Sequence, residues 1–242
     1  PIAPEVLKFF MSIGVPLFEA YGMTENCAYA TSNSPENIKI GTVGIPAHGV
    51  ELKLADDGEI LIRSGGVFKG YFKDDQATSE TIDKDGWLHT GDVGIYEGDF
   101  VKIIDRKRDI IITSGGKNVS PSEIENKIKV SPFIKEAIVI GDRRKFLSVL
   151  IGIEFDTVSN WALRKNIPHT TYRDLSEKQE VKDLVWKEIS KANELTSSLE
   201  VREFRMIPKE LDHEEGELTA TQKVKRNVLI DQFSDLIEEM YS

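Results

Sequence analysis

The sequence predicts an α+β fold: the end of a large N-terminal domain, then an antiparallel β subdomain (a distorted barrel or sandwich), then a small α+β C-terminal domain. Two observations predict this order. Short strands separated by glycines fill residues 41–104, and helical periodicity alternates with strands after residue 109. We therefore expect parts at residues 1–40, 41–107 and 108–242.

The first part contains a short helix and a candidate ligand loop. Residues 5–13 are amphipathic and stop at Gly14, and residues 15–20 are a strand candidate. The strand leads into YGMTEN at 21–26. Glycine lets a backbone approach a ligand, threonine can donate to a phosphate oxygen, and glutamate can hold Mg²⁺. Taken alone, the stretch is better explained as an ordinary polar turn.

The β subdomain is predicted from alternating runs that meet at turns. Its predicted strands and turns are, in order, 49–54, the turn 56–58, 59–63, the strand or turn 68–73, the turn 83–86, 87–90, 95–96 and 100–104. His89 is expected to be structural, because no second histidine or cysteine lies near it at a spacing typical of a metal site or a catalytic dyad.

The last part is predicted as a compact module of helices and strands. Its first helix begins with Ser120 as cap, Pro121 in the first turn and Glu123 closing a capping box. Ser176 and Gln179 are expected to open a longer helix. The other expected elements are strands at 134–140, 147–154 and 203–207, and helices at 156–166 and 225–241.

Composition narrows the class of protein. The net charge of -10 argues against nucleic acid as a partner, because that partner requires a basic surface. The single cysteine, Cys27, excludes an internal disulfide and suits a reducing cytoplasm. No apolar run is long enough to cross a bilayer. The start, PIAP, lacks signal-peptide features and an initiator methionine, so we expect a piece of a longer polypeptide.

Four motifs in order resemble the adenylate-forming enzymes, the family of acyl-CoA synthetases, luciferases and peptide-synthetase adenylation domains. The motifs are YGMTE at 21–25, GWLHTGD at 86–92, DRKRD at 105–109 and SGGKNVSPSEIE at 114–125. A fifth, GELTATQKVKR at 216–226, looks like the C-terminal lysine motif of long-chain fatty acyl-CoA synthetases. There, Gln222 replaces the family's usual glycine and Ala220 its proline, while Lys223 keeps its place.

The resemblance implies an acid–thiol ligase with two half-reactions. ATP, with Mg²⁺, activates a fatty acid as acyl-AMP, and the acyl group then passes to CoA. The implied partners are the fatty acid, ATP, CoA and the missing N-terminal part of the same polypeptide. The implied location is cytoplasmic, with peripheral contact at the inner membrane face left open. Because the family's phosphate loop and acyl tunnel lie upstream, we expect the chain to be inactive alone.

The resemblance also implies roles for individual residues. It makes Lys223 the bridge between the attacking carboxylate and the α-phosphate. The other implied roles are Thr24 on the α-phosphate, Glu25 on Mg²⁺, Tyr21 and Gly22 along the adenine, Asp92 and Arg106 at the ribose, Arg108 as the hinge of a mobile C-terminal domain, and Gly115, Gly116 and Lys117 at the channel for CoA.

Simpler interpretations exist for several of these residues. Asp92 read alone is a turn carboxylate, Arg106 a solvated member of a charge run, and the glycine pair a plain β-turn. Lys223 could be the basic start of the last helix, although the helix dipole disfavours cations there. Two alternative functions stay open: a fatty acyl-AMP ligase that loads a carrier protein, and a non-catalytic binding or interaction module.

Overall fold

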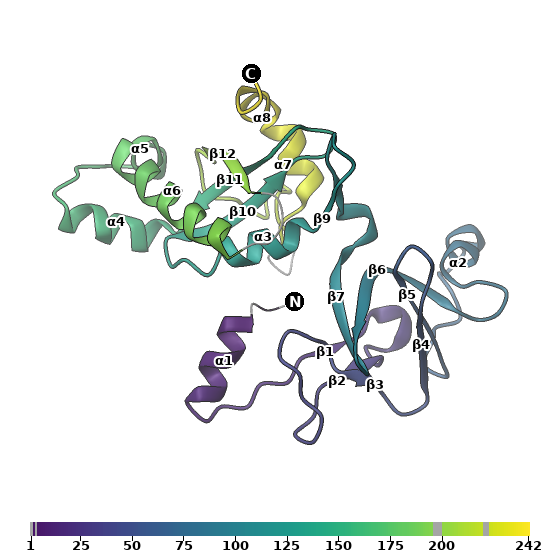
Figure 1. Cartoon of the computed structure of the whole chain (residues 1–242). Helices are drawn as coiled ribbons and strands as arrows, with labels where there is room; N and C mark the ends of the chain where they lie inside the picture. The colour runs from purple at the N-terminus through teal and green to yellow at the C-terminus, as the bar shows by residue number, and fades with distance from the viewer. Residues whose placement is uncertain (1, 3, 196–199, 220–222) are drawn as a thin grey trace. The chain divides into compact units, whose positions relative to one another are not determined.

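The computed structural model describes residues 2, 4–195, 200–219 and 223–242. The chain forms two compact units, Pro1–Ile110 and Ile111–Ser242 (Figure 1). The predicted domain boundaries, at 40/41 and 107/108, stay predictions. The mixed fold class, with antiparallel β structure before an α+β part, is confirmed.

The first unit is mostly antiparallel sheet. Its elements are α1 (Pro4–Ser12), β1 (Ala20–Tyr21), the 3₁₀ helix η1 (Thr24–Asn26), β2 (Thr31–Ser32), β3 (Ile45–Pro46), β4 (Val50–Leu54), β5 (Glu59–Ser64), α2 (Asp75–Thr81), β6 (Leu88–Glu97), β7 (Phe100–Arg106) and the 3₁₀ helix η2 (Lys107–Asp109). Strands β4–β7 form one sheet in sequence order, and β1–β3 form a smaller one.

The two sheets of the first unit share one core. The side chains of Ile60, Ile62 and Leu88 are fully buried there, together with Val43 and Val101. The Val43 N–H donates to the Val101 carbonyl at 2.8 Å, which ties the segment before β3 to β7. This core fixes β6 and β7, which carry the predicted site residues Asp92 and Arg106.

The second unit is a three-stranded sheet with helices on both faces. Its elements are β8 (Ile111–Ile112), β9 (Asn118–Val119), α3 (Pro121–Ile128), β10 (Ile134–Ile140), β11 (Leu147–Ile153), α4 (Phe155–Arg164), α5 (Tyr172–Glu177), α6 (Gln179–Glu194), β12 (Val201–Met206), α7 (Arg226–Gln232) and α8 (Ser234–Glu239). Strand β11 lies in the middle, antiparallel to β10 and parallel to β12, while β8 and β9 form a separate hairpin.

Both faces of the central strand β11 are buried. Ile151 belongs to a cluster with residues of α3, α4, α5 and α6, and Leu150 belongs to a cluster with residues of α7 and α8 (Figure 1). A strand covered on both faces is expected to read as a continuous apolar run, and LSVLIGI at 147–153 does so with the buried Ser148 as its one hydroxyl.

Several sequence expectations were wrong in detail. The strand at 15–20 is reduced to its end in β1, and Pro16 inside it has no N–H to donate to a ladder. Of the two options for residues 68–73, strand or turn, the turn is confirmed at 72–73, and it leads into α2, which Asp74 caps by accepting from the Ala77 N–H at 2.9 Å. Helix α2 buries no residue, so it has no apolar stripe by which periodicity could find it.

Two helical expectations in the second unit also change. Ser176 does not open the long helix; it lies inside the unpredicted α5, which Thr171 caps by accepting from the Asp174 N–H. The final helix is two helices, because Phe233 departs from helical geometry at φ -105° and ψ 25°. The cap expected at Ser120 is confirmed: its hydroxyl accepts from the Glu123 N–H at 3.2 Å.

Candidate functional site

Three predicted residues meet where β6 pairs with β7. Asp92 and Arg106 face each other in the ladder, and Arg106 Nε lies 3.5 Å from Asp92 Oδ1. Tyr21, from β1, donates its hydroxyl hydrogen to Asp92 Oδ2 at 2.5 Å. Burial raises the pKa of Tyr21, and the hydrogen bond to Asp92 raises it further, so the phenol keeps its proton. The nearly buried Asp92 carboxylate is therefore held in one orientation by donors on both oxygens.

Glu59 supports this cluster, and sequence reasoning missed it. Its side chain is 8% exposed, and Oε1 accepts from the Gly91 N–H at 2.9 Å. Oε2 accepts from Lys107 Nζ at 3.1 Å and lies 3.3 Å from His89 Nδ1. Burial works to raise the pKa of Glu59, but these donors outweigh it and the pKa is lowered. One signal was present: Glu59 is the acid that opens the otherwise apolar run EILI.

An open pocket of about 390 Å³ lies beside these groups. Its lining residues come from the first half of β6, the last residue of β7 and the start of η2: Thr90, Gly91, Arg106, Lys107 and Arg108. Thr90 is fixed because its hydroxyl donates to the Ile60 carbonyl at 2.7 Å. Arg108 is the most exposed of the basic residues there, with a side chain 76% exposed, and it lies two residues before the first unit ends. The pocket thus offers cationic groups along one wall.

The turn after β1 presents Thr24 and Glu25. The fully buried Asn26 holds this turn, because its Oδ1 accepts from the Met23 N–H at 2.8 Å. A Cβ on Gly22 would lie 2.3 Å from the backbone carbon of Ala28, so packing alone requires glycine there. Thr24 is exposed, and Glu25 Oε1 accepts from the Tyr71 hydroxyl at 2.8 Å. That hydrogen bond raises the pKa of Tyr71.

The fit of these residues to Mg²⁺ depends on a phosphate ligand. Among the described residues, no three His, Cys, Asp or Glu side chains are grouped as a metal cage. Mg²⁺ in nucleotide enzymes is commonly held by one or two carboxylates plus substrate phosphates. Glu25, half-buried on a fixed turn, fits the role of a single carboxylate ligand of that kind.

The glycine pair of the second unit lies on the β8–β9 hairpin. The Gly116 N–H donates to the Thr113 carbonyl at 2.8 Å, and the Lys117 N–H donates to the Thr113 hydroxyl at 3.2 Å. Gly116 has a φ of +75°, which explains glycine at that position. At Gly115 a Cβ would meet its nearest atom at 4.0 Å, so neither packing nor backbone in this unit requires glycine. Lys117 is exposed.

Lys223 also belongs to the second unit and is exposed. The Thr219 N–H donates to its carbonyl at 2.8 Å, and the Lys223 N–H donates to the Thr219 hydroxyl at 3.0 Å. A single antiparallel bridge between Leu218 and Val224 lies next to these bonds. The substitutions noted at 220 and 222 lie outside the described residues.

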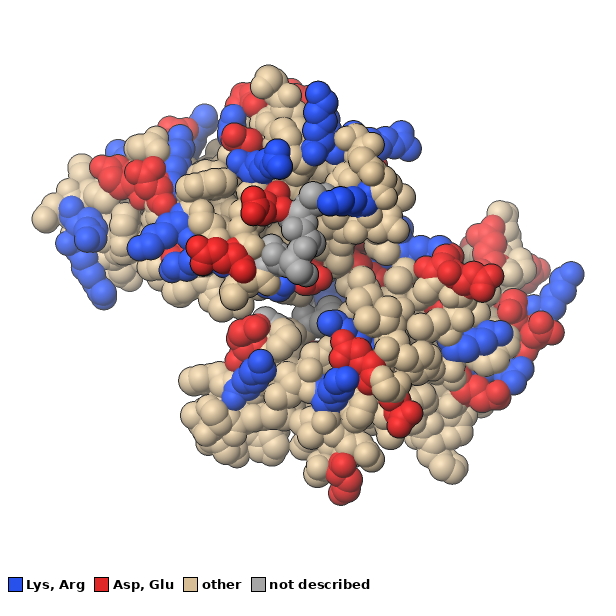
Figure 2. All heavy atoms as spheres, in the orientation of Figure 1, with Lys and Arg blue, Asp and Glu red and all other residues tan. Residues whose placement is uncertain are grey.

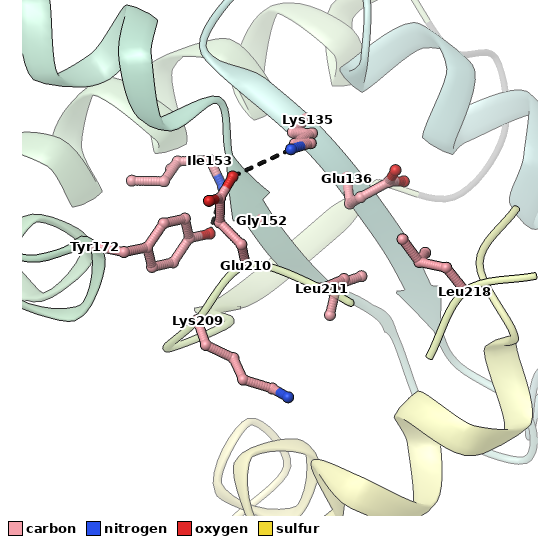
Figure 3. Close-up of a pocket in the computed structure, with 9 residues that line it drawn as sticks. All are labelled: Lys135, Glu136, Gly152, Ile153, Tyr172, Lys209, Glu210, Leu211 and Leu218. Atoms are coloured by element: carbon pink, nitrogen blue, oxygen red, sulfur yellow. Dashed lines mark hydrogen bonds and ion pairs between the residues drawn. The ribbon is translucent and has the colours of Figure 1, made fainter. Parts of the chain in front are cut away.

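A smaller cavity of about 140 Å³ lies beside this segment (Figure 3). Residues of β10, β11, α5 and the stretch after β12 line it: Lys135, Glu136, Gly152, Ile153, Tyr172, Lys209, Glu210, Leu211 and Leu218. The Tyr172 hydroxyl accepts from the Ile153 N–H at 2.9 Å, and burial raises the pKa of Tyr172 to about 12. Lys135 pairs with Glu210 at 3.1 Å across the opening.

Family models match both parts of the sequence. The model described as "AMP-binding enzyme C-terminal domain" covers residues 108–242, more than half of the chain, and the model described as "AMP-binding enzyme" covers residues 1–72. The chain belongs to the AMP-binding enzyme family. The family predicted from the motifs is thereby confirmed.

Members of the AMP-binding enzyme family with similar sequences are named as fatty acid ligases. The long-chain-fatty-acid–CoA ligase FadD15 of Mycobacterium bovis is 37% identical over 245 residues, and the match covers 100% of this chain and 41% of that protein. Human long-chain-fatty-acid–CoA ligase 6 is 35% identical over 259 residues, and the match covers 100% of this chain and 37% of that protein. The chain therefore spans well under half the length of these relatives.

Solved structures of AMP-binding enzymes share the fold. The adenylation domain of a carboxylic acid reductase from Segniliparus rugosus, in complex with AMP, matches with a TM-score of 0.76 at 22% identity and covers 100% of this chain and 38% of its own. The O-succinylbenzoate coenzyme A synthetase of Bacillus subtilis, in complex with AMP, matches with a TM-score of 0.68 at 26% identity. The match covers 95% of this chain and 44% of that one.

The surface of this family member mixes both signs of charge. Figure 2 shows acidic and basic side chains interspersed on the visible face of each unit. In the part of the chain that the structure describes, no helix has both the length and the apolar character needed to cross a membrane.

Proposed function

We propose that the chain is part of a long-chain fatty acid–CoA ligase that forms acyl-AMP from a fatty acid and ATP and then transfers the acyl group to CoA. The observation that carries the proposal is the cluster of Tyr21, Asp92 and Arg106 beside the open pocket, in a member of the AMP-binding enzyme family. The names of the similar ligases support the choice of substrate. We place the protein in the cytoplasm, where fatty acid, ATP and CoA are available.

The first unit is assigned the nucleotide. A carboxylate that is fixed by its neighbours, as Asp92 is, suits two adjacent hydroxyls such as those of ribose, and Arg106 adds donors on the same side. Tyr21 and Gly22 are assigned to the adenine and the exposed Thr24 hydroxyl to the α-phosphate. Mg²⁺ held with Glu25 neutralises phosphate charge when bound.

The second unit is assigned the groups that change between half-reactions. Lys223, a flexible cation, neutralises charge between the attacking carboxylate and the α-phosphate. Gly115, Gly116 and Lys117 are assigned to the path of the pantetheine arm of CoA; the open space at Gly115 supports this assignment. Arg108 is assigned to the hinge, with the predicted mobile domain at 108–242 turning about it.

A lysine substitution separates the two half-reactions. In the native polypeptide that carries this chain, Lys223→Ala should lower carboxylate-dependent ATP–pyrophosphate exchange by about 100-fold or more, because charge stabilisation in a transition state is lost. Thioester formation from supplied acyl-AMP should be spared. Lys187→Ala, an exposed lysine on α6, is the matched control. Equal loss of both half-reactions would refute the role of Lys223.

The acceptor is tested in the same preparation. Free CoA and a phosphopantetheinylated carrier protein are each offered with acyl-AMP. A thioester on the carrier alone would replace the CoA ligase proposal with that of a fatty acyl-AMP ligase. Absence of acyl-AMP formation with every fatty acid tested would leave the non-catalytic binding module.

A further inference from the structure

The segment that carries Lys223 is held at both ends by ion pairs that are largely shielded from water. Glu217 lies at the first end and Arg226 at the last, six residues before and three residues after the lysine. Their partners come from separate parts of the second unit, the stretch after β12 and helix α3. Each end of the segment thus has its own partner in the second unit.

The acid of the first anchor is fully buried, and its lysine partner is 32% exposed. Glu217 is 0% exposed, and its Oε1 lies 2.7 Å from Lys209 Nζ, which also contacts Glu215. The Asp212 N–H donates to Glu217 Oε2 at 2.8 Å. Burial works to raise the pKa of Glu217, but Lys209 and the Asp212 N–H outweigh it and the pKa is lowered. Figure 3 shows Lys209 on the stretch after β12, on the same pocket as Leu218, the residue that follows Glu217.

In the second anchor, Glu125 and Arg226 pair with each other and both bind the backbone of one residue on an edge strand. Val139 lies on β10, which pairs only with β11 among the described strands of its sheet. Its N–H donates to Glu125 Oε1 at 2.7 Å, and its carbonyl accepts from Arg226 Nη1 at 2.8 Å. Arg226 Nη2 pairs with the same Glu125 oxygen, and the two side chains are 20% and 12% exposed. Arg226 therefore joins the start of α7 to both β10 and α3.

Backbone hydrogen bonds connect the two anchored ends to Lys223. The Lys225 N–H donates to the Glu217 carbonyl at 2.8 Å, so the last and first ends of the segment are tied directly to each other. Next along are the Leu218–Val224 bridge and the bonds between Thr219 and Lys223. Removing one partner of a buried pair leaves an uncompensated charge, which strongly favours keeping both partners in place.

We propose that Glu217 and Arg226 are positioning residues that fix the backbone from which Lys223 reaches its substrate. The proposal rests on the role given to Lys223 above. A long flexible side chain can place its charge only as well as its own backbone is placed, and a displacement of about 1 Å at a reacting centre can cost on the order of 100-fold in rate. Neither ion pair includes Lys223, so the effect of each on the lysine passes through the backbone.

The test compares four variants of the native polypeptide. Glu217→Gln removes the charge of the first anchor at nearly constant size, and Arg226→Gln removes the charge of the second and shortens the side chain. Arg226→Lys keeps the charge but cannot form the same fork to Glu125 and the Val139 carbonyl, so an intermediate effect is expected. Arg173→Gln removes the exposed pair with Glu177 on α5 and is the matched control.

Four quantities are measured for each variant: hydrogen exchange over residues 218–225, ATP–pyrophosphate exchange, thioester formation from supplied acyl-AMP, and Tm. We expect faster hydrogen exchange over 218–225 in the two glutamine variants, and pyrophosphate exchange lower by about 10- to 100-fold. Thioester formation should stay within about twofold of the wild type, because it does not use Lys223. The control should match the wild type throughout.

Each contrary result has a distinct meaning. Unchanged hydrogen exchange in both glutamine variants overturns the anchoring, whatever the activity. Faster hydrogen exchange with normal pyrophosphate exchange overturns the positioning role. A parallel loss of both half-reactions, together with a lower Tm, also overturns it, because that result marks a purely structural role. A fully active Lys223→Ala enzyme, or a wild type without carboxylate-dependent exchange, instead overturns the proposed function, and hydrogen exchange still decides the anchoring.

Discussion

Glu59 gives a direct test of how the irregular stretch of β6 at Gly91 is held. Glu59→Gln removes the negative charge and keeps an oxygen that can accept from the Gly91 N–H, whereas Glu59→Ala removes the acceptor and leaves that N–H without it. Both changes should loosen β6 between Thr90 and Asp92. Because Asp92 is the proposed ribose ligand, the effect should also weaken AMP binding.

The magnitude follows from the contacts of the carboxylate. A hydrogen bond to a charged group contributes about 1.5–3 kcal/mol net. The pair with Lys107 is worth about 0–1 kcal/mol, because the lysine side chain is 48% exposed and water screens it. Glutamine retains a neutral bond to Gly91, so Glu59→Gln should cost about 1–2 kcal/mol and Glu59→Ala about 2–4 kcal/mol. A loss of about 1–2 kcal/mol multiplies the open population by roughly 5- to 30-fold.

Hydrogen exchange over residues 88–93 measures this opening. Near neutral pH, exchange there should be faster in Glu59→Gln by the factor given above and unchanged in Glu51→Gln, whose exposed carboxylate pairs with Arg63 on the neighbouring strand. Since the folded pKa of Glu59 is lowered, its contribution is complete above the ordinary glutamate pKa and is lost as the pH falls through the folded value. The two proteins should therefore converge in acid. Equal exchange near neutral pH, or a gap that persists in acid, would refute the assignment.

Two further substitutions test the packing of each unit. Gly22→Ala should destabilise the first unit by about 3 kcal/mol, because its Cβ overlaps the Ala28 backbone, whereas Gly65→Ala, with open space, should be neutral; thermal melts check both. Ile151→Ala, fully buried in β11, should cost about 2–5 kcal/mol, and Leu163→Ala, 61% exposed on α4, should change the free energy of unfolding by less than about 0.5 kcal/mol. Comparable losses within either pair would contradict the burial described here.

The long periodic elements could be predicted from the sequence, and the contacts between distant residues could not. Strand β11 follows from an almost continuous apolar run, β10 from the apolar run AIVI at its end, and α6 from an apolar stripe. The short helices α2 and α5 have too few residues to show a period. Their boundaries are set instead by single capping side chains, at Asp74 and Thr171.

The candidate site divides in the same way. The order of the motifs was enough to name Tyr21, Asp92 and Arg106 as candidate site residues. It did not predict that the Tyr21 hydroxyl donates to a carboxylate 71 residues away. The role of Glu59 depends on how β5 is aligned with β6, and the register shifts between Glu59 and Leu61. Such a shift changes which side chain faces Gly91, and a strand pattern alone does not specify it.

The motif glycines show which part of a motif the chain's own folding explains. Gly22 is required by a 2.3 Å approach to Ala28, and Gly116 by its positive φ, so both would be needed without any ligand. Gly115 has neither reason, and an alanine there would meet its nearest atom at 4.0 Å. Since glycine costs conformational entropy, its presence at such a position needs a cause outside the unit's own packing. Under the proposed function, a molecule passing close to the backbone would supply that cause, which makes Gly115 the best single position at which to test the proposed path of CoA.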